Sequence, residues 1–403
     1  MKSPLFLLIL SAVLFGSLLL FIYPEWAKLT SEGSTPAMQP DARASTAITP
    51  LRPQQSEARP DGDSRRSLGP VWSFRPTHKW LYRDPFKNET VEQRGGMVCT
   101  DIIVAEDRAY FGCEGGFLYC VSTDGKMLWS FETRGTRVGA PAIAGERLFF
   151  GSEDNNLYAL NPITGQQVFR FDAKSEITTT PCIADGRVFF SSRQGDIFAL
   201  KADFGKSLWI CEDDSGNSSS PVTDGVDVYV GTDSGKLLAI DAKAGGLKWS
   251  YDAGNAIRSA PVISGDRVFF ACWDGRLIGL LKSAPHQTFV TQLDGFVKST
   301  PAVSGAWIIA ATMDGLVYAI DAASGEILWS NKCADVLEAS PIVASDGRIY
   351  IGGWDGGFTA LDVETGKVLV ERFLGSMISC RAASWPDGKI VVGMKAGLEC
   401  VFK

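Results

Sequence analysis

Short apolar runs alternate with polar turns through most of this chain. Between Pro141 and Phe171 the runs are four or five residues long, rich in β-branched and aromatic types, and bounded by Gly, Asp and Asn. Runs of this kind predict β-strands, because the gaps between them are too short to hold a helix. Four such strands joined by hairpins predict one antiparallel sheet, whose strands we call A to D in chain order.

This unit recurs with a fixed period of 40 residues. The inner strand A carries Pro141, Pro181, Pro221, Pro261, Pro301 and Pro341. Twelve residues before each proline, strand D carries Trp129, Phe169, Trp209, Trp249, Phe289 and Trp329. A repeat of this length indicates stacked supersecondary units. Because one small sheet cannot bury both of its faces, we expect a ring of sheets, an all-β propeller.

The number of strands predicts eight blades of four strands. The A–B–C triple occurs eight times, but a D strand follows only seven of these triples, and the last one runs to Lys403. A candidate for the missing strand lies at the other end of the repeats, where Trp72-Ser-Phe74 repeats the triplet Trp129-Ser-Phe131. We therefore predict a propeller domain at residues 69–403 whose N-terminal strand completes the last blade.

Strands C and D carry a spaced motif, Ala-x-Asp-x-x-x-Gly-x-x-x-Trp. It is complete at Ala239 to Trp249 and at Ala319 to Trp329. The glycine permits a positive-φ corner, and the small residue leaves room beside the indole. The motif resembles the quinoprotein-type (PQQ-like) propeller repeat. This resemblance implies that buried tryptophans dock each blade on its neighbour, at Trp72, Trp129, Trp209, Trp249 and Trp329.

One unit departs from the motif, and a second propeller family is disfavoured. The fifth blade has Pro285 and Phe289 in place of the glycine and the tryptophan, and His286 is expected in its C–D corner. Trp-Asp pairs occur at Trp273 and Trp354, but they lie in B–C turns. A WD-type propeller places this dipeptide at strand ends, so we favour the PQQ-like fold.

The N-terminal region predicts a membrane attachment. Residues 4–23 are uncharged and long enough, as a helix, to span a bilayer, and no small-x-small cleavage site follows Tyr23. We expect residues 1–23 to form a membrane anchor or signal-anchor helix, and residues 24–68 a disordered stem, because that stretch has few aromatic residues. The anchor would sit in the inner membrane and the propeller outside the cytoplasm, in the periplasm if the cell is a Gram-negative bacterium.

Composition excludes some classes of function. The formal net charge is −7, which disfavours nucleic acid as a partner. The two histidines, His78 and His286, are far apart and match no metal motif, so we expect no cofactor or metal. The nine cysteines fit small buried positions; a bridge between Cys99 and Cys380 stays open as an alternative.

The resemblance implies two different functions. Quinoprotein dehydrogenases of this fold bind pyrroloquinoline quinone (PQQ) with Ca²⁺, and many have an adjacent cysteine pair that this chain lacks. The size and the repeat are similar to the BamB family, scaffold lipoproteins of outer-membrane β-barrel assembly, although no lipid-accepting cysteine follows the apolar segment. We expect a non-catalytic, membrane-tethered scaffold for protein partners. A quinone-dependent (PQQ/Ca) dehydrogenase and a small-ligand-sensing ectodomain are the alternatives.

Three places are candidates for partner binding. About 17 extra residues follow Trp72 and include Trp80, Tyr82, Arg83 and Phe86, which either anchor a partner or plug the central channel. Three residues before their prolines, Arg258, Lys298 and Glu338 bring charges to the channel mouth, either for an anionic ligand or as a solvated rim. Trp273 and Trp354 form either an exposed aromatic pair or packing on a neighbouring blade.

Overall fold

The computed structural model describes residues 71–83, 90–94, 96–217 and 219–402. They belong to one compact unit, Ala58–Lys403. The expected anchor at 1–23 and stem at 24–68 lie outside the described residues. Within the part that is described, no helix is both long and apolar enough to cross a bilayer.

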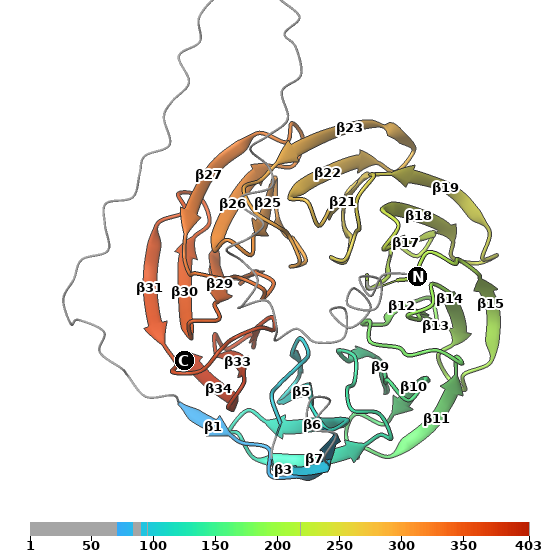
Figure 1. The fold of residues 1–403 in the computed structure, drawn as a ribbon, viewed down its shortest axis with the longest axis vertical. Helices are drawn as coiled ribbons and strands as arrows, with labels where there is room; N and C mark the ends of the chain where they lie inside the picture. Colours follow the sequence, from blue (N-terminus) through green and yellow to red (C-terminus); the bar gives the residue numbers. More distant parts are fainter. Residues whose placement is uncertain (1–70, 84–89, 95, 218, 403) are drawn as a thin grey trace, which may run out of the picture. The chain divides into compact units, whose positions relative to one another are not determined.

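The described residues form eight four-stranded antiparallel sheets, arranged as the blades of a propeller (Figure 1). Blades 1 to 3 comprise β4 (Ile103–Ala105), β5 (Arg108–Cys113), β6 (Phe117–Ser122) and β7 (Met127–Glu132); β8 (Ala142–Ala144), β9 (Arg147–Gly151), β10 (Asn156–Leu160) and β11 (Gln167–Asp172); and β12 (Cys182–Ala184), β13 (Arg187–Ser191), β14 (Ile197–Lys201) and β15 (Ser207–Cys211). Blades 4 and 5 comprise β16 (Val222–Thr223), β17 (Asp227–Gly231), β18 (Lys236–Asp241) and β19 (Leu247–Asp252); and β20 (Val262–Ser264), β21 (Arg267–Ala271), β22 (Arg276–Leu281) and β23 (Ala284–Gln292). Blades 6 and 7 comprise β24 (Ala302–Ser304), β25 (Trp307–Ala311), β26 (Leu316–Asp321) and β27 (Ile327–Lys332); and β28 (Ile342–Val343), β29 (Arg348–Gly352), β30 (Gly357–Asp362) and β31 (Val368–Phe373).

The eighth blade joins the two ends of the repeat region. It consists of β32 (Ala383–Ser384), β33 (Ile390–Met394), β34 (Gly397–Phe402) and, as its outer strand, β1 (Trp72–Phe74). β1 pairs antiparallel with β34, with Trp72 opposite Cys400 and Phe74 opposite Leu398. The predicted closure of the last blade by the N-terminal strand is confirmed, and so is the number of blades.

The core lies between the blades. The buried side chains form eight clusters, and each cluster combines residues of two neighbouring blades. The cluster that contains Phe111 of blade 1 and Val391 of blade 8 closes the ring. Strands B and C supply most of these residues, since each is buried on both faces, as Phe149 and Phe150 in β9 show. Because these strands are buried on both faces, each blade depends on its neighbours for its core.

Small residues precede the prolines of the inner strands, and some of them hydrogen-bond to the neighbouring blade through their hydroxyl groups. The Thr180 N–H donates to Ser220 Oγ (2.9 Å), and the Thr300 N–H donates to Ser340 Oγ (2.9 Å). Ala260 makes the same bond to Thr300 Oγ1 at 3.2 Å. Each bond joins inner strands of adjacent blades, 40 residues apart. The hydroxyl groups thus accept main-chain N–H groups that lie just before the inner strands.

Two segments differ from the expectation. The insertion after Trp72 is not merely a loop, because Lys79–Arg83 (β2) and Thr90–Arg94 (β3) form a separate two-stranded sheet. In blade 5 the corner contracts to a tight hairpin in which Leu281 lies opposite Ala284. The prediction that His286 lies in the C–D corner is therefore wrong: it lies inside β23, where its side chain is exposed.

Candidate functional site

The docking tryptophans bind the following blade. The indole Nε1–H of Trp72, Trp129, Trp209 and Trp329 donates to the main-chain oxygen of Thr123, Pro162, Ala242 and Val363, at 2.7, 3.0, 3.1 and 3.1 Å. Each acceptor lies in the next C–D corner. The corner glycine packs directly against the indole. At Gly165 (φ 71°) an added Cβ would stand 2.6 Å from the Trp129 ring, so a larger residue would not fit there.

Two details of this docking differ from the prediction. We expected buried tryptophans, but all five docking side chains are only half-buried, because the outer strands face solvent. Blade 5 has Pro285 at the position of the corner glycine, and the Trp249 ring lies 5.8 Å from that of Tyr229. The docking role of the tryptophans is otherwise as the motif implies.

The predicted binding residues gather on one face of the ring. In antiparallel blades the B–C turns and the D–A connections lie at the same end of the strands. We call this end the loop face, and the end with the A–B turns and C–D corners the corner face. The insertion hairpin, the three charges before the prolines and both B–C turn tryptophans therefore share the loop face.

A stack of a cation and two aromatic rings lies across blade 5 on the loop face. The Arg258 guanidinium carbon is 4.8 Å from the centre of the Trp273 ring, and the Trp273 ring stacks on Phe296 at 5.8 Å. The other side of Arg258 is paired with Asp233, with Nε and Oδ1 3.2 Å apart. Phe296 ends the stack with 45% of its surface exposed.

A second group links blades 6 and 7. The Lys298 ammonium is paired with the Glu338 carboxylate, which also accepts the indole N–H of Trp354 at 3.0 Å. Phe296 and Lys298 lie in the same D–A connection, so the two groups are continuous along the chain. We call the seven residues the loop-face cluster: Asp233, Arg258, Trp273, Phe296, Lys298, Glu338 and Trp354.

The cluster corrects the idea of free charges at the channel mouth. Arg258 and Lys298 are not open sites for a small anion, because a carboxylate already pairs with each. Trp273 and Trp354 contact the connecting loops rather than each other. Sequence reasoning missed Phe296, although the five other repeats that carry the inner-strand proline have Thr136, Glu176, Gly216, Ala256 and Val336 at its position, so an aromatic residue there stands out.

The insertion is attached to blade 1 through His78. Its ring stacks on Phe117 at 3.9 Å, Nε2 hydrogen-bonds with the Glu114 carbonyl at 3.0 Å, and Nδ1 with the Tyr119 hydroxyl. Burial lowers the pKa of the imidazole, so it stays neutral at pH 7. A neutral, stacked histidine with two hydrogen bonds is a structural anchor.

The hairpin beyond this anchor carries three of the predicted binding residues. Trp80, Tyr82 and Arg83 lie in β2, with Trp80 opposite Gln93 and Tyr82 opposite Val91. Their side chains and the whole of Phe86 lie outside the described positions. Whether the hairpin binds a partner or plugs the channel therefore stays a prediction.

All nine cysteines are free thiols, so the Cys99–Cys380 bridge does not form in this structure. Cys99 Sγ points instead to the Gly112 carbonyl (3.6 Å) and Cys380 Sγ to that of Gly393 (3.5 Å). Burial raises the pKa of Cys99 to about 12. These thiols are protonated core residues rather than nucleophiles.

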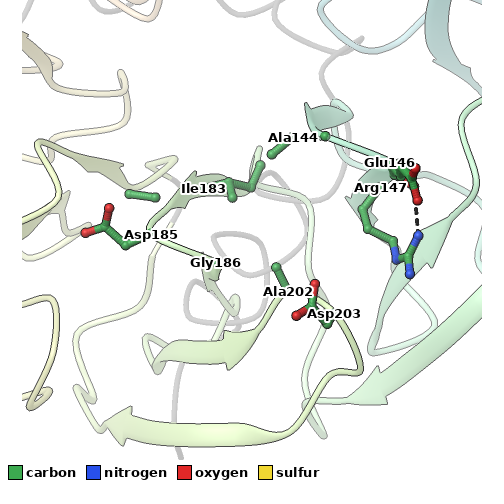
Figure 2. Close-up of a pocket in the computed structure, with 10 residues that line it drawn as sticks. Ala144, Glu146, Arg147, Ile183, Asp185, Gly186, Ala202 and Asp203 are labelled. Atoms are coloured by element: carbon green, nitrogen blue, oxygen red, sulfur yellow. Dashed lines mark hydrogen bonds between the residues drawn. The ribbon is translucent and has the colours of Figure 1, made fainter.

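The corner face has a cavity that the sequence did not indicate. It lies between blades 2 and 3 and has a volume of about 450 Å³. The A–B turns of both blades and the C–D corner of blade 3 line it (Figure 2). Ile183, Ala144 and Ala202 form its apolar part, and Arg147 and Asp203 bring charges to it.

Comparison with known proteins agrees with this architecture. A sequence model of a family described as outer membrane protein assembly factor BamB matches residues 71–168, 114–278 and 284–394. The chain belongs to this family. The family is one of PQQ-like repeat propellers, as the docking motif implied.

Solved structures with the same fold include both kinds of protein. BamB from Moraxella catarrhalis superposes with a TM-score of 0.67 at 19% identity, over 75% of this chain and 96% of that one. Quinohemoprotein alcohol dehydrogenase from Comamonas testosteroni gives 0.66 at 15% identity, over 84% and 76%. At these identities the likeness shows the fold alone.

Two curated relatives are similar over short segments. The Comamonas testosteroni quinohemoprotein alcohol dehydrogenase is 31% identical over 100 residues, which are 21% of this chain and 14% of that one. A lanthanide-dependent methanol dehydrogenase from Methylacidiphilum fumariolicum is 34% identical over 80 residues, 19% and 13% of the two chains. The chain thus matches about one seventh of the length of these enzymes.

The described residues do not fit a cation-anchored quinone. Among them, no three His, Cys, Asp or Glu side chains come together in a way that suits a metal ion. We derive no catalytic step through PQQ or Ca²⁺ for this part of the chain.

Proposed function

We propose that this chain is a non-catalytic interaction scaffold for protein partners in outer-membrane protein assembly. The BamB family match supports a role of this class. The observation that carries the proposal is the loop-face cluster, in which Arg258, Trp273 and the exposed Phe296 form one stack. Arginine and large aromatic residues are the types that dominate binding energy at protein interfaces.

The pairing within the cluster suits a pre-ordered surface. Arg258 and Lys298 are each held by a carboxylate, and Glu338 is held by Trp354. Side chains already fixed in the free protein lose less conformational entropy on binding. We infer that a partner segment packs on Phe296 and Trp273, while the ion pairs hold the surrounding charged side chains in position.

The anchor and the location are part of the same proposal. A helix at residues 1–23 would tether the propeller to the inner membrane, and the stem at 24–68 would let it work in the periplasm. Membrane fractionation and protease protection of the full chain test this arrangement. Recovery of the full chain in the soluble fraction would contradict it.

Site-specific photo-crosslinking tests the interface. A photo-reactive residue at position 296 of the full-length protein should crosslink to a defined component of outer-membrane protein assembly. The matched control is position 163, since Ile163 is 61% exposed but lies in a C–D corner on the corner face. Phe296→Ala with Arg258→Ala should remove that partner, whereas Ile163→Ala should not. Identical crosslinks at both positions would refute the loop face as the interface.

The short similarity to dehydrogenases supports a second candidate, a quinone-dependent enzyme. Adding PQQ with Ca²⁺ distinguishes the two, because a ligand that binds the folded state raises Tm. The scaffold proposal expects neither a shift in Tm nor dye-linked alcohol oxidation. Either signal would favour the enzyme. A small-ligand sensor would show a shift with another compound and no oxidation.

A further inference from the structure

On the corner face, arginines from strand B tie neighbouring blades together. Arg187 Nη1 donates to the Ala242 carbonyl of the next blade at 2.8 Å, the same oxygen that accepts the Trp209 indole. Arg108 Nη1 reaches the Ile163 carbonyl at 3.5 Å, beside the bond from Trp129 to Pro162. At these two junctions, 1/2 and 3/4, a guanidinium and an indole thus cover the corner of the following blade.

The junction between them, 2/3, lacks both ties. Its docking residue is Phe169, which has no N–H to donate. Its arginine, Arg147, donates Nη1 to the Glu146 carbonyl of its own turn (3.0 Å), and its buried Nε has no partner. By position in the repeat, the Ala202 carbonyl corresponds to these acceptors. Phe169 cannot donate to it, and Arg147 donates to the Glu146 carbonyl instead.

The cavity lies at this same junction, between the turns of blades 2 and 3 (Figure 2). Ala202 and Asp203 line it together with Glu146, Arg147 and Asp185. Asp185 is paired with Arg187 at 3.1 Å, whereas the exposed carboxylates of Glu146 and Asp203 have no ion pair among the described residues. The charged residues that line the cavity are therefore three acids, Glu146, Asp185 and Asp203, and one base, Arg147, and Arg187 pairs with one of the acids. The cavity therefore combines an apolar floor, a main-chain acceptor and a small excess of negative charge.

We propose that this cavity binds an arginine side chain of a partner protein. Its guanidinium would take the position that arginine from strand B occupies at the two flanking junctions, and donate to the Ala202 carbonyl and to Asp203. The apolar stem of the arginine would lie along Ile183 and Ala144. A planar guanidinium suits a site with a carbonyl and a carboxylate side by side, because it donates from several nitrogens at once. The site lies on the face opposite the loop-face cluster and does not depend on the function proposed for it.

The test is a titration of the full-length protein with blocked tripeptides, followed by NMR of the main-chain amides. Acetyl-Ala-Arg-Ala-amide should shift the amides of Gly186, Ala202 and Asp203 and bind at least about tenfold more tightly than the neutral citrulline peptide. The lysine peptide should bind more weakly than the arginine peptide, since an ammonium group lacks the planar set of donors of a guanidinium. Asp203→Asn should weaken the arginine peptide about tenfold. Equal shifts with citrulline, or shifts elsewhere, would overturn the proposal.

A filling variant separates binding from folding. Ala144→Phe adds a large ring to the apolar part of the cavity and should abolish the arginine shifts. Ala105→Phe is the matched control, because Ala105 is the last residue of strand A in blade 1, as Ala144 is in blade 2; it should leave peptide binding unchanged. Thermal unfolding of both variants checks that they fold. Undiminished binding by Ala144→Phe would refute the site, and so would equal loss in both variants. The loop-face substitutions Phe296→Ala and Arg258→Ala should not alter this binding.

Discussion

The indole of Trp72 donates its hydrogen to the main-chain oxygen of Thr123 at 2.7 Å, across the junction where the ring closes. The same residue pairs with Cys400 in the last strand. Trp72 therefore connects blade 8, in which its strand lies, to blade 1. A closure made by one short strand depends on such contacts, because β1 has only three residues.

Replacing Trp72 measures the strength of the closure. We expect Trp72→Ala to lower the free energy of unfolding by about 3 kcal/mol, the low end for loss of a large aromatic side chain, because the indole is half-buried. Trp72→Phe keeps most of the packing and loses the hydrogen bond, so it should cost about 1 kcal/mol. Urea unfolding followed by circular dichroism gives both values. Similar costs for the two variants would show that the hydrogen bond, not the packing, holds the strand.

The repeat made most of the fold predictable. A 40-residue period fixes where each strand begins, and the count of D strands revealed the closure by β1. The binding surface was less predictable, because it depends on which loops become neighbours: nothing in the spacing of Arg258, Trp273 and Phe296 indicates that they stack. The cavity was missed for a related reason. Phe169 is visible as a variant of the motif, but the direction in which Arg147 turns depends on the local turn and not on the pattern.

The hydroxyl groups around the axis offer a test of the bonds between inner strands. Ser340→Ala removes the acceptor of the Thr300 N–H and should lower the free energy of unfolding by about 1 kcal/mol. Ser330→Ala is the control, because its side chain is exposed on an outer strand, and it should change stability by less than about 0.5 kcal/mol. Chemical denaturation of both variants checks this. Equal effects would mean that the inner serine contributes only by its size.

The buried thiols predict a loss of stability at high pH. In the unfolded chain a thiol ionises near its usual pKa of 9.0, whereas burial holds the pKa of Cys99 at about 12 and that of Cys272 at about 12. Between these values the unfolded state binds fewer protons, so the free energy of unfolding should fall as pH rises from 9 to about 12. Cys99→Ala with Cys272→Ala should reduce the slope of this fall. In the native protein at pH 8, a thiol-reactive disulfide reagent should label the fully buried Cys272 only slowly; rapid labelling would contradict its burial.

His78 should make the protein less stable as the pH falls into the mildly acidic range. Burial lowers the pKa of its imidazole below the usual 6.5, so below pH 6.5 the unfolded chain binds a proton that the folded one does not. Stability is therefore fully present above pH 6.5 and is lost as pH falls through the lowered folded-state pKa. His78→Gln should remove this dependence between pH 7 and 5.5, because glutamine does not titrate. Thermal unfolding of both proteins at these two pH values gives the difference, and limited proteolysis of the β2–β3 hairpin reports whether its attachment to Phe117 and Tyr119 loosens. Parallel pH profiles for wild type and variant would show that His78 does not hold the insertion in its neutral form.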